Sequence, residues 1–183
     1  TENSCTVSQN VIQNNIGQYV GGLKLNGSAI ISNNTFSGNG VSSSLANLTA
    51  ALYLSGSRGD GVGEFSVSGN TITGNQATAS SGRVISVSND TGANQGSIPS
   101  SSGVINNNNI SGNTADYVLY YDADSSSTLD ATNNWWGTTN DTEIQARIFD
   151  WNDDVSYNFI DYTPFLTAPT IKKTGDLEVP KIL

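Results

Sequence analysis

The sequence lacks several residues on which enzymes and disulfide-bonded domains depend. Its 183 residues include no histidine and only one cysteine, Cys5, so no internal disulfide can form. Without histidine, a general base near neutral pH would have to be a lysine or carboxylate with a strongly shifted pKa. Surface proteins of bacteria and archaea often lack disulfides, whereas small secreted animal domains seldom do. These absences favour a non-catalytic protein whose fold is held without disulfides.

Charge is also scarce, and basic residues are scarcer than acidic ones. Seven lysines and arginines stand against 16 acidic residues, which gives a net charge of −9 at pH 7. A nucleic-acid surface needs clustered basic residues, and here they are scattered along the chain. No stretch approaches the roughly 20 consecutive apolar residues that a membrane-spanning helix requires. We therefore expect no nucleic-acid partner and no membrane span, while the acidity favours solubility and cations.

Asparagine, serine, threonine and glycine are abundant, and within them one short pattern recurs. An asparagine is followed two residues later by a large apolar residue, and a glycine or asparagine comes two residues after that. The copies begin 24, 36, 38 and 25 residues apart, at Asn10, Asn34, Asn70, Asn108 and Asn133. A period of this length indicates a repeat architecture in which neighbouring units stack to bury their apolar faces.

Each repeat contains three short apolar patches. In one unit they are Leu23 to Leu25, Ala29 to Ile31, and Phe36. Short alternating runs bounded by glycine, asparagine and serine predict strands. Three short strands in a unit of about two dozen residues predict one coil of a parallel β-helix. The expected fold class is therefore all-β, a solenoid of about five coils.

The repeated asparagine has a physical role at the corner of such a coil. Asparagine tolerates the left-handed backbone conformation of a sharp turn, and its amide can bond to the asparagines above and below it. The alternative is that asparagine is merely abundant, but the apolar residue two positions on matches in every copy. We expect a ladder made of Asn10, Asn34, Asn70, Asn108 and Asn133.

The repeat ends at Trp135, Trp136 and Gly137. Alternation should place one indole inward, and the pattern puts Trp135 at the position of Ile110, with the other ring outward under a cap. A ligand-binding role for the two tryptophans is the alternative. Beyond them, Ile144 and Ile148 are spaced as on one face of a helix over residues 141–150. We therefore divide the chain into coils (1–139), a C-terminal cap of helix and strand (140–166), and a tail or linker (167–183) that could serve as an inter-subunit strand.

The end of the chain also resembles a known family. The stretches Asn133 to Thr138 (NNWWGT), Glu143 to Asp150 (EIQARIFD) and Asp161 to Leu166 (DYTPFL) resemble the C-terminal coils of right-handed parallel β-helix proteins of the pectate-lyase-like superfamily. The likeness covers about residues 5–166. It implies a right-handed β-helix at the surface or outside of a bacterial or archaeal cell. It implies no activity, because this fold hosts lyases, epimerases, adhesins and structural proteins.

Two kinds of ligand site are conceivable from the residues. Tyr53 and Tyr120 should face outward from one strand stack, where aromatic rings can bind glycans or simply shield the sheet. Oxygen-rich turns could hold calcium or could merely cap the backbone. The calcium candidates are Asp122, Asp124, Asp130, Asp150 and Asp154. No other cofactor is expected.

The first coil begins almost at once, near Thr6 and Val7, without a covering helix. Such an end exposes unpaired strand edges. We therefore expect a non-catalytic, extracellular structural or adhesive module of a cell surface or filament. Its partners would be copies of itself, assembled head to tail, or neighbouring repeats of a longer chain. The alternative is a module that binds cell-surface glycans, or a polysaccharide lyase-like enzyme.

Overall fold

The structure, a computed structural model, describes residues 4–55, 64–88, 103–122 and 128–170 and consists mainly of short strands in four parallel sheets. Sheet A contains β1 (Cys5–Ser8), β5 (Ala29–Ser32), β9 (Phe65–Ser68), β13 (Gly103–Asn106), β17 (Leu129–Asp130) and β19 (Ile160–Asp161). Sheet B contains β2 (Val11–Gln13), β6 (Thr35–Ser37), β10 (Thr71–Thr73) and β14 (Asn109–Ser111). Sheet C contains β3 (Ile16–Gly17), β7 (Gly40–Val41), β11 (Gln76–Ala77) and β15 (Thr114–Ala115). Sheet D contains β4 (Leu23–Asn26), β8 (Thr49–Ser55), β12 (Arg83–Ser88), β16 (Tyr117–Asp122) and β18 (Ile148–Phe149).

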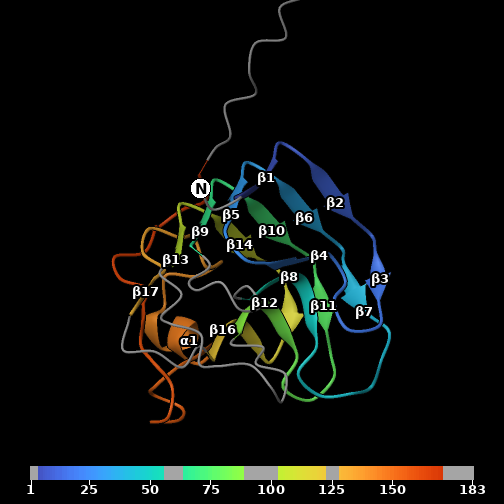
Figure 1. The fold of residues 1–183 in the computed structure, drawn as a ribbon. Coiled ribbons are helices and arrows are strands. Elements are labelled where there is room, and N and C mark those ends of the chain that lie inside the picture. Colours follow the sequence, from blue (N-terminus) through green and yellow to red (C-terminus); the bar gives the residue numbers. More distant parts are fainter. Residues whose placement is uncertain (1–3, 56–63, 89–102, 123–127, 171–183) are drawn as a thin grey trace, which may run out of the picture.

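The chain visits the sheets in the constant order A, B, C, D and then returns to A one rung further along. Figure 1 shows these coils following one another from the blue first coil to the orange cap. The predicted fold class, an all-β stack of parallel strands arranged as in a parallel β-helix, is confirmed. Each of the first four coils has four strands, however, and not the three expected. The additional strands, those of sheet C, are only two residues long, too short to show a periodic pattern in the sequence.

Two corners of each coil are built on residues with a left-handed backbone. Between sheets A and B this residue directly precedes a ladder asparagine, as Asn33 (φ 58°) precedes Asn34. Between sheets B and C it is Asn14 or a glycine such as Gly38 (φ 62°). Asparagine and glycine tolerate this conformation at little cost. The turn residue and the ladder residue are therefore two neighbouring positions, where the sequence suggested a single one.

The core consists of apolar side chains that stack in register from coil to coil. One row runs through sheet B, where Ile12 lies beside Phe36, then Ile72, then Ile110. The last three are fully buried, whereas Ile12 in the first coil is only partly buried. Burial of each such side chain contributes about 1.5–3 kcal/mol relative to exposure. Most of the fold's stabilisation by burial therefore comes from the inner coils.

The cap begins with helix α1 (Asp141–Gln145), which is short because the chain soon returns to sheet D. The Asn140 side chain accepts a hydrogen bond from the backbone N–H of Thr142, and Ile144 is buried. The prediction of a helix as far as residue 150 is wrong, because Ile148 starts β18 and pairs with β16. Among the described residues, no helix is long and apolar enough to cross a membrane.

Candidate functional site

A ladder of asparagines follows the corner between sheets A and B through the whole stack. The backbone N–H of Asn34 donates to Oδ1 of Asn70 at 2.8 Å, and the Asn34 side-chain amide donates to the same oxygen at 3.1 Å. The same pair of bonds links each member to the next. The members are Asn10, Asn34, Asn70, Asn108 and Asn134.

The expectation that Asn133 closes this ladder is wrong by one residue. Asn133 has φ 57° and occupies the turn position, while Oδ1 of Asn134 accepts from Asn108 at 2.9 Å. The tryptophans shift with it. Trp135 pairs with Asn109, so Trp136 takes the register position of Ile110 and is 6% exposed, whereas Trp135 is half-buried. Gly137 follows with φ 87°. Trp136, and not Trp135, therefore fills the core of the last coil.

A second ladder, which the sequence reading missed, follows the corner between sheets B and C. The Asn39 amide donates to Oδ1 of Asn75 at 2.9 Å and to the backbone oxygen of Ile12 at 2.8 Å. The signal was present, because an asparagine stands five residues after each of the first four members of the first ladder. The members of this second row are Asn15, Asn39, Asn75 and Asn113.

The far end of the second ladder is closed by Arg147 from the cap. In earlier coils the backbone oxygen of each ladder asparagine accepts from the next coil, as Asn75 accepts from the N–H of Thr114 at 2.9 Å. At Asn113 that donor is replaced by Nη2 of Arg147 at 2.9 Å. Burial lowers the pKa of Arg147. The last coil therefore finds in the cap a hydrogen-bond partner that another coil would otherwise supply.

The first coil has no such cover among the described residues. Asn10 and Asn15 are exposed, and the inward side chains Ile12 and Leu25 are only partly buried. The outward side chains Val11 and Ile16 are 65% and 67% exposed. Each later asparagine in the ladders accepts from the coil before it, so the acceptors of Asn10 and Asn15 belong to this open side. In the described part of the chain, the first coil therefore exposes polar and apolar groups whose equivalents in the later coils are buried.

The glycan candidates lie in one outward row of sheet D, and the row is more crowded than expected. The row is Lys24, Tyr53, Ser86, Tyr120 and Phe149. Tyr120 is only 7% exposed, because its ring stacks on Phe149 at 4.4 Å and lies under the guanidinium of Arg83 at 3.3 Å. Tyr53 is half-buried, with the Lys24 amino group 4.6 Å from its ring centre. Of the two tyrosines, only Tyr53 offers surface to a ligand.

Arg83, which was not among the candidate site residues, also lies on this face beside Tyr120. It is 6% exposed, and its Nη2 donates to the side-chain oxygen of Asn47 at 3.0 Å. Its Nε is buried and has no hydrogen-bond partner among the residues that the structure describes. Desolvation lowers the pKa of Arg83, although the nearby Tyr120 and Asp122 act in the opposite direction. A buried guanidinium with an unused N–H is a place where an anionic group would be stabilised.

Three of the calcium candidates cap backbone turns, and the candidates within the described residues do not converge. Asp150 is fully buried and accepts from the N–H groups of Asn152 and Ile160, both at 3.0 Å. Asp130 accepts from Thr132 at 3.0 Å, and the N–H of Ser156 holds the pKa of Asp154 below its usual value. Asp122 ends β16, and Asp124 lies outside the described residues. Within the described ranges, no three acidic or cysteine side chains gather around one point. Calcium binding stays a prediction.

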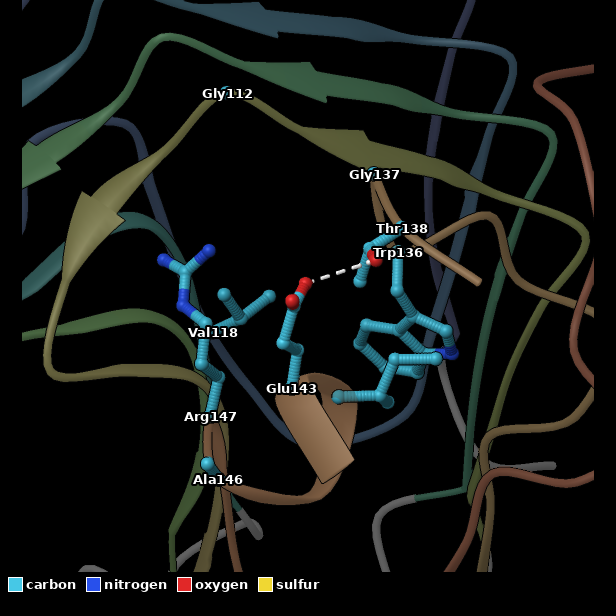
Figure 2. A pocket seen from close by; sticks show the side chains of 9 residues that line it. Gly112, Val118, Trp136, Gly137, Thr138, Glu143, Ala146 and Arg147 are labelled. Carbon is cyan, nitrogen blue, oxygen red and sulfur yellow. Dashed lines mark hydrogen bonds between the residues drawn. The ribbon is translucent and has the colours of Figure 1, made fainter. Parts of the chain in front are cut away.

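A cavity of about 380 Å³ lies between the last coil and α1. Figure 2 shows Glu143 and Arg147 pointing from the cap toward the turn at Gly112, between β14 and β15, with Trp136 on the other side of Glu143 from Arg147. The residues that line the cavity are Gly112, Val118, Trp136, Gly137, Thr138, Glu143, Ile144, Ala146 and Arg147. The cavity is thus lined by two charged side chains, one indole ring and the backbone of two glycines.

Comparisons with known proteins found no matching family model, no matching curated protein and no matching solved structure.

Proposed function

We propose that this chain is a non-catalytic structural or adhesive module of a prokaryotic cell surface or extracellular filament, and that its first coil stacks against another parallel coil. The observation that carries the proposal is the contrast between a last coil closed by Trp136, α1 and Arg147 and a first coil that leaves Val11 and Ile16 exposed. The resemblance to pectate-lyase-like β-helix proteins supports the extracellular setting.

The chemistry of the open coil defines its partner. Each ladder acceptor in the inner coils receives one backbone N–H and one side-chain amide N–H from the coil before it, as Asn70 does from Asn34. A partner that completes Asn10 and Asn15 therefore offers the same donors in the same register, in a parallel coil of the same kind. Such a coil belongs to a second copy of this chain or to neighbouring repeats of a longer one.

The tail supplies a second element of the proposal. The side chain of Asn109 on sheet B makes two hydrogen bonds to the backbone of Thr170. The Thr170 N–H donates to Oδ1 at 2.7 Å, and the Asn109 side-chain amide donates to the Thr170 oxygen at 2.8 Å. The described chain thus ends against the outer side of the stack. Residues 171–183, part of the predicted inter-subunit strand, lie outside the described residues. We propose that they add to a neighbouring subunit.

The test is assembly of the purified chain, followed by electron microscopy and sedimentation velocity. We expect filaments or larger oligomers that disappear in the double variant Val11→Lys/Ile16→Lys, because charges on an edge strand oppose pairing. The control is the double variant Thr71→Lys/Gln76→Lys, which adds two lysines at the corresponding outward positions of sheets B and C, two coils inward. Removal of residues 171–183 should also weaken assembly. Polymers that persist in Val11→Lys/Ile16→Lys would contradict the stacking proposal.

A glycan-binding role is the second candidate, and the unpartnered Nε of Arg83 beside Tyr53 and Tyr120 favours it. A carboxylate or sulfate on a polysaccharide would pair with Arg83 once the groups that cover its Nε move aside, while Tyr53 contacts a sugar ring. Affinity electrophoresis in acidic and in neutral polysaccharides tests this. Retardation by acidic polymers should be lost in Tyr53→Ala and kept in Tyr19→Ala, an exposed tyrosine outside the row. Equal retardation of both variants would contradict this candidate, and release of unsaturated ends would establish a lyase.

A further inference from the structure

The cavity beside α1 exists because the last coil is incomplete on one side. Beyond the fourth coil, sheet A continues with β17 and β19, sheet D with β18, and sheet B with the bridge at Trp135. Among the described residues, no strand extends sheet C beyond β15. Helix α1 covers this region, but five residues do not fill the space that a strand and its side chains would occupy. The hollow is therefore a consequence of the topology of the cap.

Opposite charges line this hollow without neutralising each other. Oε2 of Glu143 accepts from the Thr138 hydroxyl at 2.9 Å, and Oε1 accepts from the Asn140 amide at 3.1 Å. Arg147 uses Nη2 on the backbone oxygen of Asn113. In the described part of the chain, Glu143 and Arg147 form no ion pair with each other. Each keeps hydrogen-bonding capacity, because a carboxylate has about four lone-pair sites and a guanidinium five N–H groups.

The other walls of the cavity are formed by apolar side chains or by glycine backbone. Trp136, Val118 and Ile144 supply carbon surface, and all three are buried residues of the core. Gly112 (φ 63°) and Gly137 (φ 87°) line the opposite side without side chains. The indole nitrogen of Trp136 lies on the side of the ring away from Glu143 in Figure 2, so ring carbons face the charged groups. An apolar face beside polar groups at fixed places is the usual make-up of a small-ligand site.

The geometry points to a binding site for a single neutral pyranose ring, such as the terminal sugar of a glycan. A sugar hydroxyl both donates to Glu143 and accepts from Arg147, and the C–H face of the ring packs on Trp136. An anion would meet Glu143, a cation would meet Arg147, and an apolar ligand would strip water from both charges without replacing its hydrogen bonds. The volume is at the small end of the range of ligand pockets, which suits one ring. This site is separate from the row on sheet D and does not depend on coil stacking.

Two-dimensional ¹H–¹⁵N NMR of the full chain tests the site, because Trp135, Trp136 and Trp151 each give one indole N–H signal. Methyl α-glucoside, methyl α-mannoside and N-acetylglucosamine are titrated in turn. We expect at least one of them to shift the Trp136 signal, assigned with Trp136→Phe, and to leave Trp151 in place. The variant Ala146→Phe closes the cavity from its exposed rim without removing a polar group, and it should abolish the shift.

Two further variants separate recognition from structure. Arg147→Lys keeps the charge but loses the planar donor set, and the sugar should bind at least about tenfold more weakly, as for loss of a hydrogen bond to a charged group. Tyr53→Ala should bind the sugar as the parent chain does, whatever the outcome at sheet D. No movement of the Trp136 signal with any of the three sugars would overturn the proposal. A shift that persists unchanged in Ala146→Phe would overturn it as well.

Discussion

The two ends of the stack are made from the same repeat and are finished differently. At the last coil, Trp136 fills the core, Ile144 of α1 covers it, and Arg147 donates to the free oxygen of Asn113. At the first coil, Ile12 is only partly buried and Asn10 is exposed. An inner ladder asparagine bonds to the coils on both sides, whereas Asn10, in the part of the chain that the structure describes, bonds to no neighbouring coil except the one that follows it. In the described residues, the first coil has one neighbour. We therefore expect the same side chains to contribute less to the free energy of unfolding there than in the inner coils.

Removal of core volume should show the largest difference between inner and outer coils. Ile72→Ala empties a fully buried position between Phe36 and Ile110, and we expect a loss of about 4 kcal/mol in the free energy of unfolding. Ile12→Ala removes the same atoms from the partly buried first coil and should cost about 1 kcal/mol. Urea unfolding monitored by circular dichroism measures both. Equal losses would mean that the first coil is as well packed as the third.

Removal of a ladder amide should give the next largest effect. Asn70→Ala takes away the oxygen that accepts from Asn34 and the amide that donates to Ile31. These partners are buried, so we expect a loss of about 3 kcal/mol. Asn10→Ala lies at the exposed end, where water replaces the amide, and should cost less than about 1 kcal/mol. A small effect at Asn70, measured by the same urea titration, would contradict a stabilising role of the ladder.

The closing arginine should have a smaller effect than an inner asparagine. Arg147→Met keeps the aliphatic stem and removes the donor to Asn113, whose oxygen can then bind water from the adjoining cavity. We expect a loss of about 1 kcal/mol, and no change in the stability difference between Ile12→Ala and the parent chain. Thermal unfolding of the single and double variants tests this. A loss as large as that of Asn70→Ala would show that Arg147 stabilises the last coil as much as an inner ladder asparagine stabilises its own.

Alkaline pH should weaken the capped end slightly. Burial, together with the bond from its hydroxyl to Asp141 at 3.0 Å, raises the pKa of Tyr162 to about 12. The unfolded chain loses this proton at its ordinary pKa near 10, so the folded state binds more protons between pH 10 and 12. Stability from Tyr162 is therefore complete below pH 10 and is lost as pH rises toward 12. In Tyr162→Phe, the loss of melting temperature over this range should be smaller. An unchanged slope would contradict the assignment.

Much of the fold followed from the sequence, because the repeated pattern reports both a turn and a core position. Asn34, Asn70 and Asn108 were placed in the ladder correctly, since each precedes an apolar residue by two. At the end of the repeat, Asn133 and Asn134 both satisfy that spacing, with Trp135 and Trp136 respectively. Only burial and the left-handed backbone of Asn133 decide between them. A local pattern cannot resolve two alignments that differ by one residue.

The candidate sites were less predictable, because they depend on contacts across coils of unequal length. Tyr53 and Tyr120 were assigned to one outward row correctly, but the sequence did not show that Arg83 and Phe149 would cover Tyr120. Arg83 lies at the start of β12 after a loop with no repeated pattern. The cavity beside α1 likewise requires the early end of the helix, which depends on the pairing of β18 with β16.

The most direct test of the stacking proposal is hydrogen exchange of the full chain, measured by mass spectrometry at low and high protein concentration. Association at the first coil predicts that peptides covering residues 4–26 gain protection with concentration, while peptides covering residues 65–77 do not change. The gain should vanish in Val11→Lys/Ile16→Lys. Exchange in residues 4–26 that is the same at every concentration, in a sample whose oligomers are visible by sedimentation, would contradict the account.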